Sequence, residues 1–276
     1  MLSALLLLLI GSADIVRQRR AAVTAGIGIA IIWMAVTFIG WFGCGVPLWA
    51  TIIPVVMAAG WLATTTSREH VRRPAGLWPV AGLAGSLVLL LAFDHTGIST
   101  SGFVVDWHAD APIGLLRATQ LPTLALALAT FVFLTESSNV IVRAALHPRV
   151  EPVQAPGFQA DDIGRPRMRM RWRQRTVGSE KARPVATSTT DLSSADLRGG
   201  RLIGPLERLL IVALTLSGAY AIVAAIIAAK GIVRFPEISR DGLSGSKAEY
   251  FLVGSLVSWT VAVVAAGLLW LSVQGF

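Results

Sequence analysis

The sequence predicts an all-α membrane protein in which several transmembrane helices form a polytopic bundle. Hydrophobic residues make up 54% of the 276 residues and charged residues only 14%, which is too little charge to cover the surface of a soluble domain of this size. The apolar residues also occur in runs of about 20, the length that a helix needs to cross the hydrocarbon core of a bilayer.

Seven apolar runs are candidate transmembrane helices. They cover residues 1–16, 21–42, 48–66, 75–93, 121–146, 202–229 and 249–273. The first run is short, and its arginines at positions 17, 19 and 20 follow it rather than precede it, unlike those of a cleaved secretory signal. We therefore expect a retained first helix. The alternative to seven spanning helices is six, with a re-entrant N-terminal helix.

The charges of the loops predict how the helices are oriented, because cytoplasmic loops of membrane proteins carry an excess of Lys and Arg. The loops after the first and third runs are basic, whereas residues 94–120 hold three aspartates and one arginine. This pattern places the N-terminus outside the cell membrane and the C-terminus in the cytoplasm. The connection of residues 230–247 then lies outside although it holds four basic residues, which conflicts with the rule.

The pattern divides the chain into three regions. They are a five-helix membrane region at residues 1–146, a basic linker at 147–201 and a two-helix hairpin at 202–276. The linker holds 11 Lys and Arg against six Asp and Glu and has few apolar residues. It cannot bury enough apolar surface to order itself, so we expect most of it to be disordered and cytoplasmic.

Arginine alternates with other residues in the middle of this linker. The alternating arginines are Arg165, Arg167, Arg169, Arg171, Arg173 and Arg175. An extended chain places them on one side, where each would be attracted to anionic lipids of the inner leaflet by about 1 kcal/mol. A solvated linker is the alternative. No nucleic-acid-binding fold accompanies the strip, so membrane lipids are expected as its partner and nucleic acid is not.

Charged residues inside apolar helices are the first candidates for a functional site, because each costs roughly 2.5–3.5 kcal/mol near the centre of a membrane helix. In the fifth run, Glu136, Asn139 and Arg143 share one helical stripe. Other charged residues expected near the same membrane face are Asp14, Arg17, Glu207 and Arg208. This cluster either binds a proton, an ion or a headgroup, or it fixes helix packing through hydrogen bonds and ion pairs.

A second group of charges brackets the last connection. Lys230 and Glu249 are expected near one membrane face, where they could pair across the helical hairpin. Lys230 and Arg234 are one turn apart and could meet one anionic group such as a lipid phosphate, and Glu237 follows them. A structural role of these residues is the alternative.

The loop at residues 94–120 contains the single weak candidate for a metal site. In an extended strand, Asp106, His108 and Asp110 would point the same way and offer carboxylate and imidazole ligands to zinc or another divalent ion. A solvated loop is the alternative. Cys44 is the only cysteine, so the chain has neither an internal disulfide nor a metal site made of cysteines.

Three separated blocks at residues 202–211, 228–237 and 247–258 resemble a bacterial family of small multi-pass membrane proteins known only as a domain of unknown function. The blocks carry E-R-L-L-I from Glu207, A-A-K-G-I-V-R-F-P-E from Ala228 and A-E-Y-F-L-V-G-S-L from Ala248. The resemblance implies a shared constellation and no particular activity. Its members would be Glu207, Arg208, Lys230, Arg234, Glu237, Glu249 and Tyr250. The arginine-rich insert departs from the compact form of the family.

These observations favour a transport-like protein, or an accessory protein that binds lipid or a membrane-protein partner, in a bacterial cell envelope. No cofactor is expected. The alternative is a membrane-embedded, metal-dependent enzyme that uses the Asp/His loop. An enzyme is favoured less because the sequence contains no G-x-S-x-G, H-E-x-x-H or G-x-x-x-x-G-K-[ST] motif.

Overall fold

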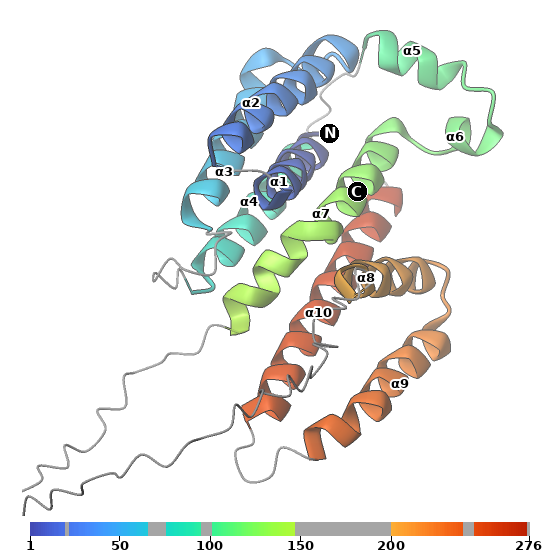
Figure 1. Cartoon of the computed structure of the whole chain (residues 1–276). Helices are drawn as coiled ribbons and strands as arrows, with labels where there is room; N and C mark the ends of the chain where they lie inside the picture. Colours follow the sequence, from blue (N-terminus) through green and yellow to red (C-terminus); the bar gives the residue numbers. More distant parts are fainter. Residues whose placement is uncertain (20–21, 66–75, 95–100, 147–199, 240–245, 275–276) are drawn as a thin grey trace, which may run out of the picture. The chain divides into compact units, whose positions relative to one another are not determined.

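The computed structural model describes residues 1–19, 22–65, 76–94, 101–146, 200–239 and 246–274, and in these residues it contains helices and no strand (Figure 1). The helices are α1 (Leu2–Arg19), α2 (Ala22–Phe38), η1 (Ile39–Gly43), α3 (Leu48–Thr64), α4 (Trp78–Asp94), α5 (Phe103–Ala109), α6 (Gly114–Ala118), α7 (Leu121–Leu146), α8 (Gly200–Leu216), α9 (Tyr220–Ser239) and α10 (Ser246–Gln274). The expected linker, with its six arginines from Arg165 to Arg175, lies outside the described residues.

Three helices of the described part are long and apolar enough to cross a membrane. They are Val23–Gly43, Leu121–Leu146 and Glu249–Gln274. Three shorter apolar helices are Leu48–Thr64, Trp78–Asp94 and Tyr220–Val233. The predicted all-α fold class is confirmed for the described residues, and the length and composition of these helices support the predicted membrane character. The expected number of seven spanning helices is not confirmed.

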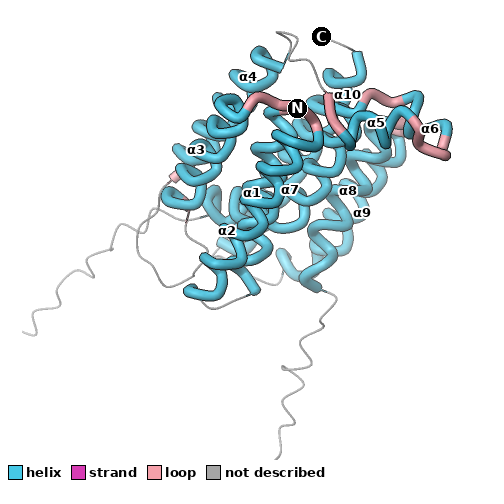
Figure 2. The backbone as a smooth tube through the Cα atoms, turned by 90° about the horizontal axis from the view of Figure 1, so that it is seen from above, coloured by secondary structure: helices cyan, strands magenta, loops and turns pink. Residues whose placement is uncertain are grey.

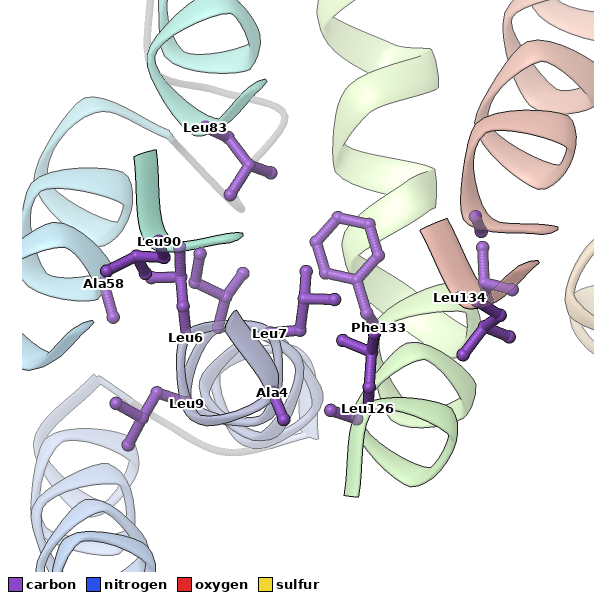
Figure 3. Close-up of a cluster of buried hydrophobic side chains, with 14 of the residues drawn as sticks. Ala4, Leu6, Leu7, Leu9, Ala58, Leu83, Leu90, Leu126, Phe133 and Leu134 are labelled. Carbon is purple, nitrogen blue, oxygen red and sulfur yellow. The ribbon is translucent and has the colours of Figure 1, made fainter. Parts of the chain in front are cut away.

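The first helix, α1, is enclosed by its neighbours. Leu2, Leu6, Leu9 and Ile10 are each at most 1% exposed, and the helix packs against α2, α3, α4 and α7. Figure 3 shows the leucines of α1 between α3, α4 and α7. Because its first 13 residues are apolar or small on all sides, α1 can be buried on all sides.

The helices α1 and α7 pack closely against each other and lie side by side (Figure 2). The two helices run parallel, since Gly11 faces Phe133 and Asp14 lies near Ser137 further along both helices. A Cβ atom at Gly11 would lie 2.9 Å from the backbone nitrogen of Phe133. Glycine at this position therefore allows the two backbones to approach closely, as is common between membrane helices.

The helix α10 runs antiparallel to α7. Near the start of α7, the Thr123 hydroxyl donates to the Ser272 carbonyl at 3.2 Å, and the Ser272 hydroxyl donates to Thr123 Oγ1 at 3.0 Å. At the other end of α7, Leu146 packs against Gly254. The start of α10 therefore lies at the end of the bundle where α7 finishes.

The expected sixth span, residues 202–229, is two helices rather than one. The helix α8 ends at Leu216 and α9 begins at Tyr220, and between them Gly218 has a φ of +74°. Glycine adopts this left-handed conformation without steric cost and commonly ends a helix. The region at 202–276 is consequently a three-helix region, and the expected two-helix hairpin is wrong.

This additional reversal changes where the chain ends. The end of α10 lies beside the start of α7, and the cavity at this end of the bundle is also lined by Met1 of the N-terminus. The described N-terminal and C-terminal residues are thus at the same end of the bundle. The expected orientation, with the two termini on opposite sides of the membrane, depends on one span at 202–229, and the break at Gly218 removes that premise.

Candidate functional site

The polar residues of α7 are buried rather than exposed to the surroundings of the bundle. Glu136 is 8% exposed, and Ser137 and Ser138 are fully covered. The hydroxyls of Thr135 and Ser138 donate to carbonyls of their own helix, at Val132 and Leu134. Local hydrogen bonds of this kind let hydroxyl side chains remain inside an apolar helix bundle.

Arg208 of α8 connects three helices. Its guanidinium donates to Asn139 Oδ1 on α7 at 2.7 Å, to the Leu134 carbonyl on α7 at 3.3 Å and to Ser258 Oγ on α10 at 3.3 Å. The Asn139 amide in turn donates to Glu136 Oε2 at 3.3 Å. Arg208 is only 2% exposed, so these hydrogen bonds replace the water that its charge has lost.

The neighbouring residue, Glu207, connects α8 to both other helices of the C-terminal region. One carboxylate oxygen accepts a hydrogen bond from Lys230 of α9 at 2.5 Å, and the other accepts one from the Trp259 indole of α10 at 2.8 Å. The Lys230 ammonium also lies 5.6 Å from the centre of the Trp259 ring, within range of a cation–π interaction. Glu207, Lys230 and Trp259 thus form one contact group among the three helices.

A separate group of charges lies between α1, α3 and α7. Asp14 is fully buried, and Arg17 of the same helix lies 2.6 Å from its carboxylate. The Trp61 indole of α3 donates to Asp14 at 3.2 Å, and Arg17 donates to both the carbonyl and the hydroxyl of Thr65 at 2.9 Å. On α7, Ser137 and Arg143 are also near enough to act on Asp14.

The structure places members of the predicted inner cluster in two sets of contacts around α7. Glu136 and Asn139 approach Arg208, whereas Arg143 acts electrostatically on Asp14 and Arg17. Sequence reasoning did not identify four uncharged partners. They are Trp61, Thr65, Ser258 and Trp259. No signal in their local sequence marks them, because Trp61, Ser258 and Trp259 lie in ordinary apolar helices and Thr65 directly follows one. Each gains its role from a residue of a facing helix.

The expected pairing of Lys230 with Glu249 is wrong. Lys230 pairs with Glu207 instead, and Glu249 is exposed at the start of α10. The reason is the break at Gly218, which turns α9 back along α8 and brings Lys230 to Glu207. The side chains of Arg234 and Glu237, predicted members of this group, lie outside the described residues.

The expected metal site of Asp106, His108 and Asp110 is also wrong. Asp106 and His108 lie in the helix α5 and not in a strand, and Asp110 follows the last residue of this helix. Successive residues of a helix are turned by about 100°, so His108 points about 200° away from Asp106. Its Nε2 lies 2.8 Å from the Leu116 carbonyl and 3.0 Å from that of Thr119. No group of three or more His, Cys, Asp or Glu side chains among the described residues could hold a metal ion.

No family model, no curated protein and no solved structure matches the chain. The resemblance of the three C-terminal blocks to a bacterial membrane family therefore stays a prediction.

Proposed function

We propose that this chain is a multi-pass membrane protein with a transport-like function, and that Glu207 is the group that binds and releases a proton. The observation that carries the proposal is the position of its carboxylate, which contacts Lys230 on α9 and Trp259 on α10 from a residue of α8. Ionisable residues inside membrane helices commonly belong to proton or ion pathways, so Glu207 and its partner Lys230 are the first candidates.

The two neighbouring charges of α8 differ in how they can respond to protonation. Arg208 has hydrogen-bond partners on α7 and α10 that hold it in place. Glu207 is joined to Lys230 by an ion pair that a proton on the carboxylate would weaken. The helix α9 packs mainly against α8, so loss of this pair would loosen α9 and leave Gly218 as its hinge.

The direction of the helices supports a topology with both described chain ends outside the cell. The start of α10 and the end of α7 lie at one end of the bundle, so the basic segments 147–201 and 230–247 both adjoin this end. Placing it in the cytoplasm satisfies the positive-inside rule for all basic segments and removes the conflict that a single span at 202–229 created. The C-terminal resemblance supports a bacterial cell envelope as the location.

Proton movement into proteoliposomes tests this function directly. The purified protein is reconstituted into vesicles that contain a pH-sensitive dye, and an inward proton gradient is imposed with a potassium ionophore to balance charge. We expect faster acidification with the wild type than with protein-free vesicles, and loss of this difference in Glu207→Gln. Glu249→Gln is the matched control, because it removes the same charge from the exposed start of α10.

An accessory protein that binds lipid or a partner would give the opposite pattern. In that case wild-type vesicles would acidify no faster than protein-free vesicles, although the protein is folded and inserted. Glu207→Gln would then lower only the amount of folded protein, because the residue would serve helix packing alone.

A further inference from the structure

A cavity of about 440 Å³ lies at the end of the bundle that holds the N-terminus. Its walls come from α1, α2, η1, α5, α6 and α7. The lining is mostly aliphatic, as with Leu5 and Leu8 of α1 and Leu124 and Leu128 of α7. Its ionisable side chains are His108 and Cys44. An occupant would therefore meet an apolar surface nearly everywhere.

The cavity opens toward the apolar exterior of the bundle. Ile39 of η1, Trp107 of α5 and Leu128 of α7 line it and are themselves 47%, 61% and 59% exposed. Ile39 and Leu128 belong to Val23–Gly43 and Leu121–Leu146, two of the three described helices that are long and apolar enough to cross a membrane. A molecule can thus enter from the hydrocarbon of the bilayer without crossing water.

Aromatic rings at the same end of the bundle indicate where the cavity lies in the bilayer. Phe38, Trp41 and Phe42 contact one another, and the Phe42 ring lies 6.2 Å from that of Phe103 at the start of α5. Trp is enriched at the boundary between hydrocarbon and headgroups, and Trp41 of this group and Trp107 of the cavity lining are 45% and 61% exposed. The cavity therefore adjoins this boundary, where lipid chains begin.

Part of the cavity wall is an unusual backbone segment. The segment η1 is a π-helical turn, a rare conformation that is frequent at functional sites. A Cβ atom at Gly40 would lie 3.2 Å from the Leu5 side chain, so a larger residue would press against the wall. Apolar walls that face a space of this size lose dispersion contacts unless another molecule supplies them.

We propose that this cavity binds one acyl chain of a membrane phospholipid. The phospholipid is the source that fits, because the opening faces the hydrocarbon of the bilayer and its edge lies at the aromatic boundary where a headgroup would remain in water. The site is separate from Glu207 and does not depend on proton movement by this protein.

Cys44 provides a reporter inside the cavity, because it lines the wall and is the only cysteine of the chain. Burial raises the pKa of the Cys44 thiol, an effect that the amino terminus partly offsets, so alkylation should be slow enough to follow by intact-protein mass. The delipidated protein is kept in a sterol-based detergent whose rigid rings do not imitate an acyl chain. The rate with N-ethylmaleimide is then measured with added dioleoylphosphatidylcholine, with oleic acid and with neither.

We expect the phospholipid to slow alkylation about tenfold at ten times its dissociation constant. In Ala125→Phe, which fills the cavity from α7, added phospholipid should no longer change the rate. Ala127→Phe is the matched control, since Ala127 is on the same helix and half-buried but outside the lining. Leu121→Trp, at the start of α7, replaces Ala125→Phe if that variant does not fold.

Three results would overturn the proposal. The first is an alkylation rate that phospholipid leaves unchanged in the wild type. The second is protection by oleic acid and not by phospholipid, which would assign the cavity to a free fatty acid. The third is protection that persists in the folded cavity-filling variant.

Discussion

Two of the ion pairs between described side chains are built differently. Asp14 and Arg17 belong to one helix, one turn apart, with side-chain exposures of 0% and 11%. Glu207 and Lys230 belong to two helices joined through Gly218, and their side chains are 10% and 28% exposed. The first pair can therefore form within α1 alone, whereas the second exists only while α9 lies against α8.

This difference suggests separate roles for the two pairs. The Asp14 carboxylate sits between three helices and receives Trp61 and Arg17, so it fastens α1 in the centre of the bundle. Glu207 contacts α9, a helix at the edge of the bundle whose side chains Ile222, Ile232 and Val233 are each more than half exposed. The first pair is a fixed anchor of the fold, and the second is a contact that can open without unfolding the rest.

The largest effect is expected for the anchor. Asp14→Ala leaves the Arg17 guanidinium buried without its carboxylate and should lower the free energy of unfolding by about 3–5 kcal/mol. Detergent-solubilised protein, followed by its thermal transition and its elution profile, measures the loss. Asp106→Ala is the control, since that carboxylate is exposed on α5. If the Asp14→Ala protein folds and its thermal transition is unchanged, the pair of Asp14 and Arg17 is not an anchor of the fold.

An intermediate effect is expected for Arg208, the fixed neighbour of Glu207. Arg208→Met keeps much of the side-chain volume but deprives Asn139 and Ser258 of their shared donor. Loss of hydrogen bonds to a charged group should cost about 2–3 kcal/mol of unfolding free energy. Denaturant titration in mild detergent gives the value. A cost near that of an exposed substitution would mean that Arg208 does not bind the three helices together.

The smallest effect is expected for the ion pair of Glu207 and Lys230 between α8 and α9. In a double-mutant cycle, the free energy of unfolding is measured for Glu207→Gln, for Lys230→Met and for the double variant. The coupling energy between the two residues should be about 1 kcal/mol, as is usual for polar contacts between membrane helices. The same cycle on Asp14 and Arg17 should give a larger coupling. Equal couplings would contradict the comparison, because they would make both pairs anchors of the same kind.

Part of the site follows from local sequence. Glu136, Asn139 and Arg208 stand out because polar side chains inside apolar runs are costly, and the structure does bring them together. Their partner Ser258 could not be singled out in this way, because a serine within an apolar helix can bond to its own backbone. The sequence also marks Lys230 as a candidate, but it suggests Glu249 as the partner, whereas the structure pairs Lys230 with Glu207.

Hydrophobic runs and their charged interruptions were sufficient to determine the all-α membrane character of this protein, since both depend on composition along one helix. The tertiary structure decided three other features. They are the enclosure of α1, the break at Gly218 and the partners of the charges on α7. The first and the third depend on which helices face one another, and apolar side chains fit lipid and protein neighbours equally well. Polar pairing between helices, together with the conformational freedom of one glycine, selects the arrangement that hydropathy leaves open.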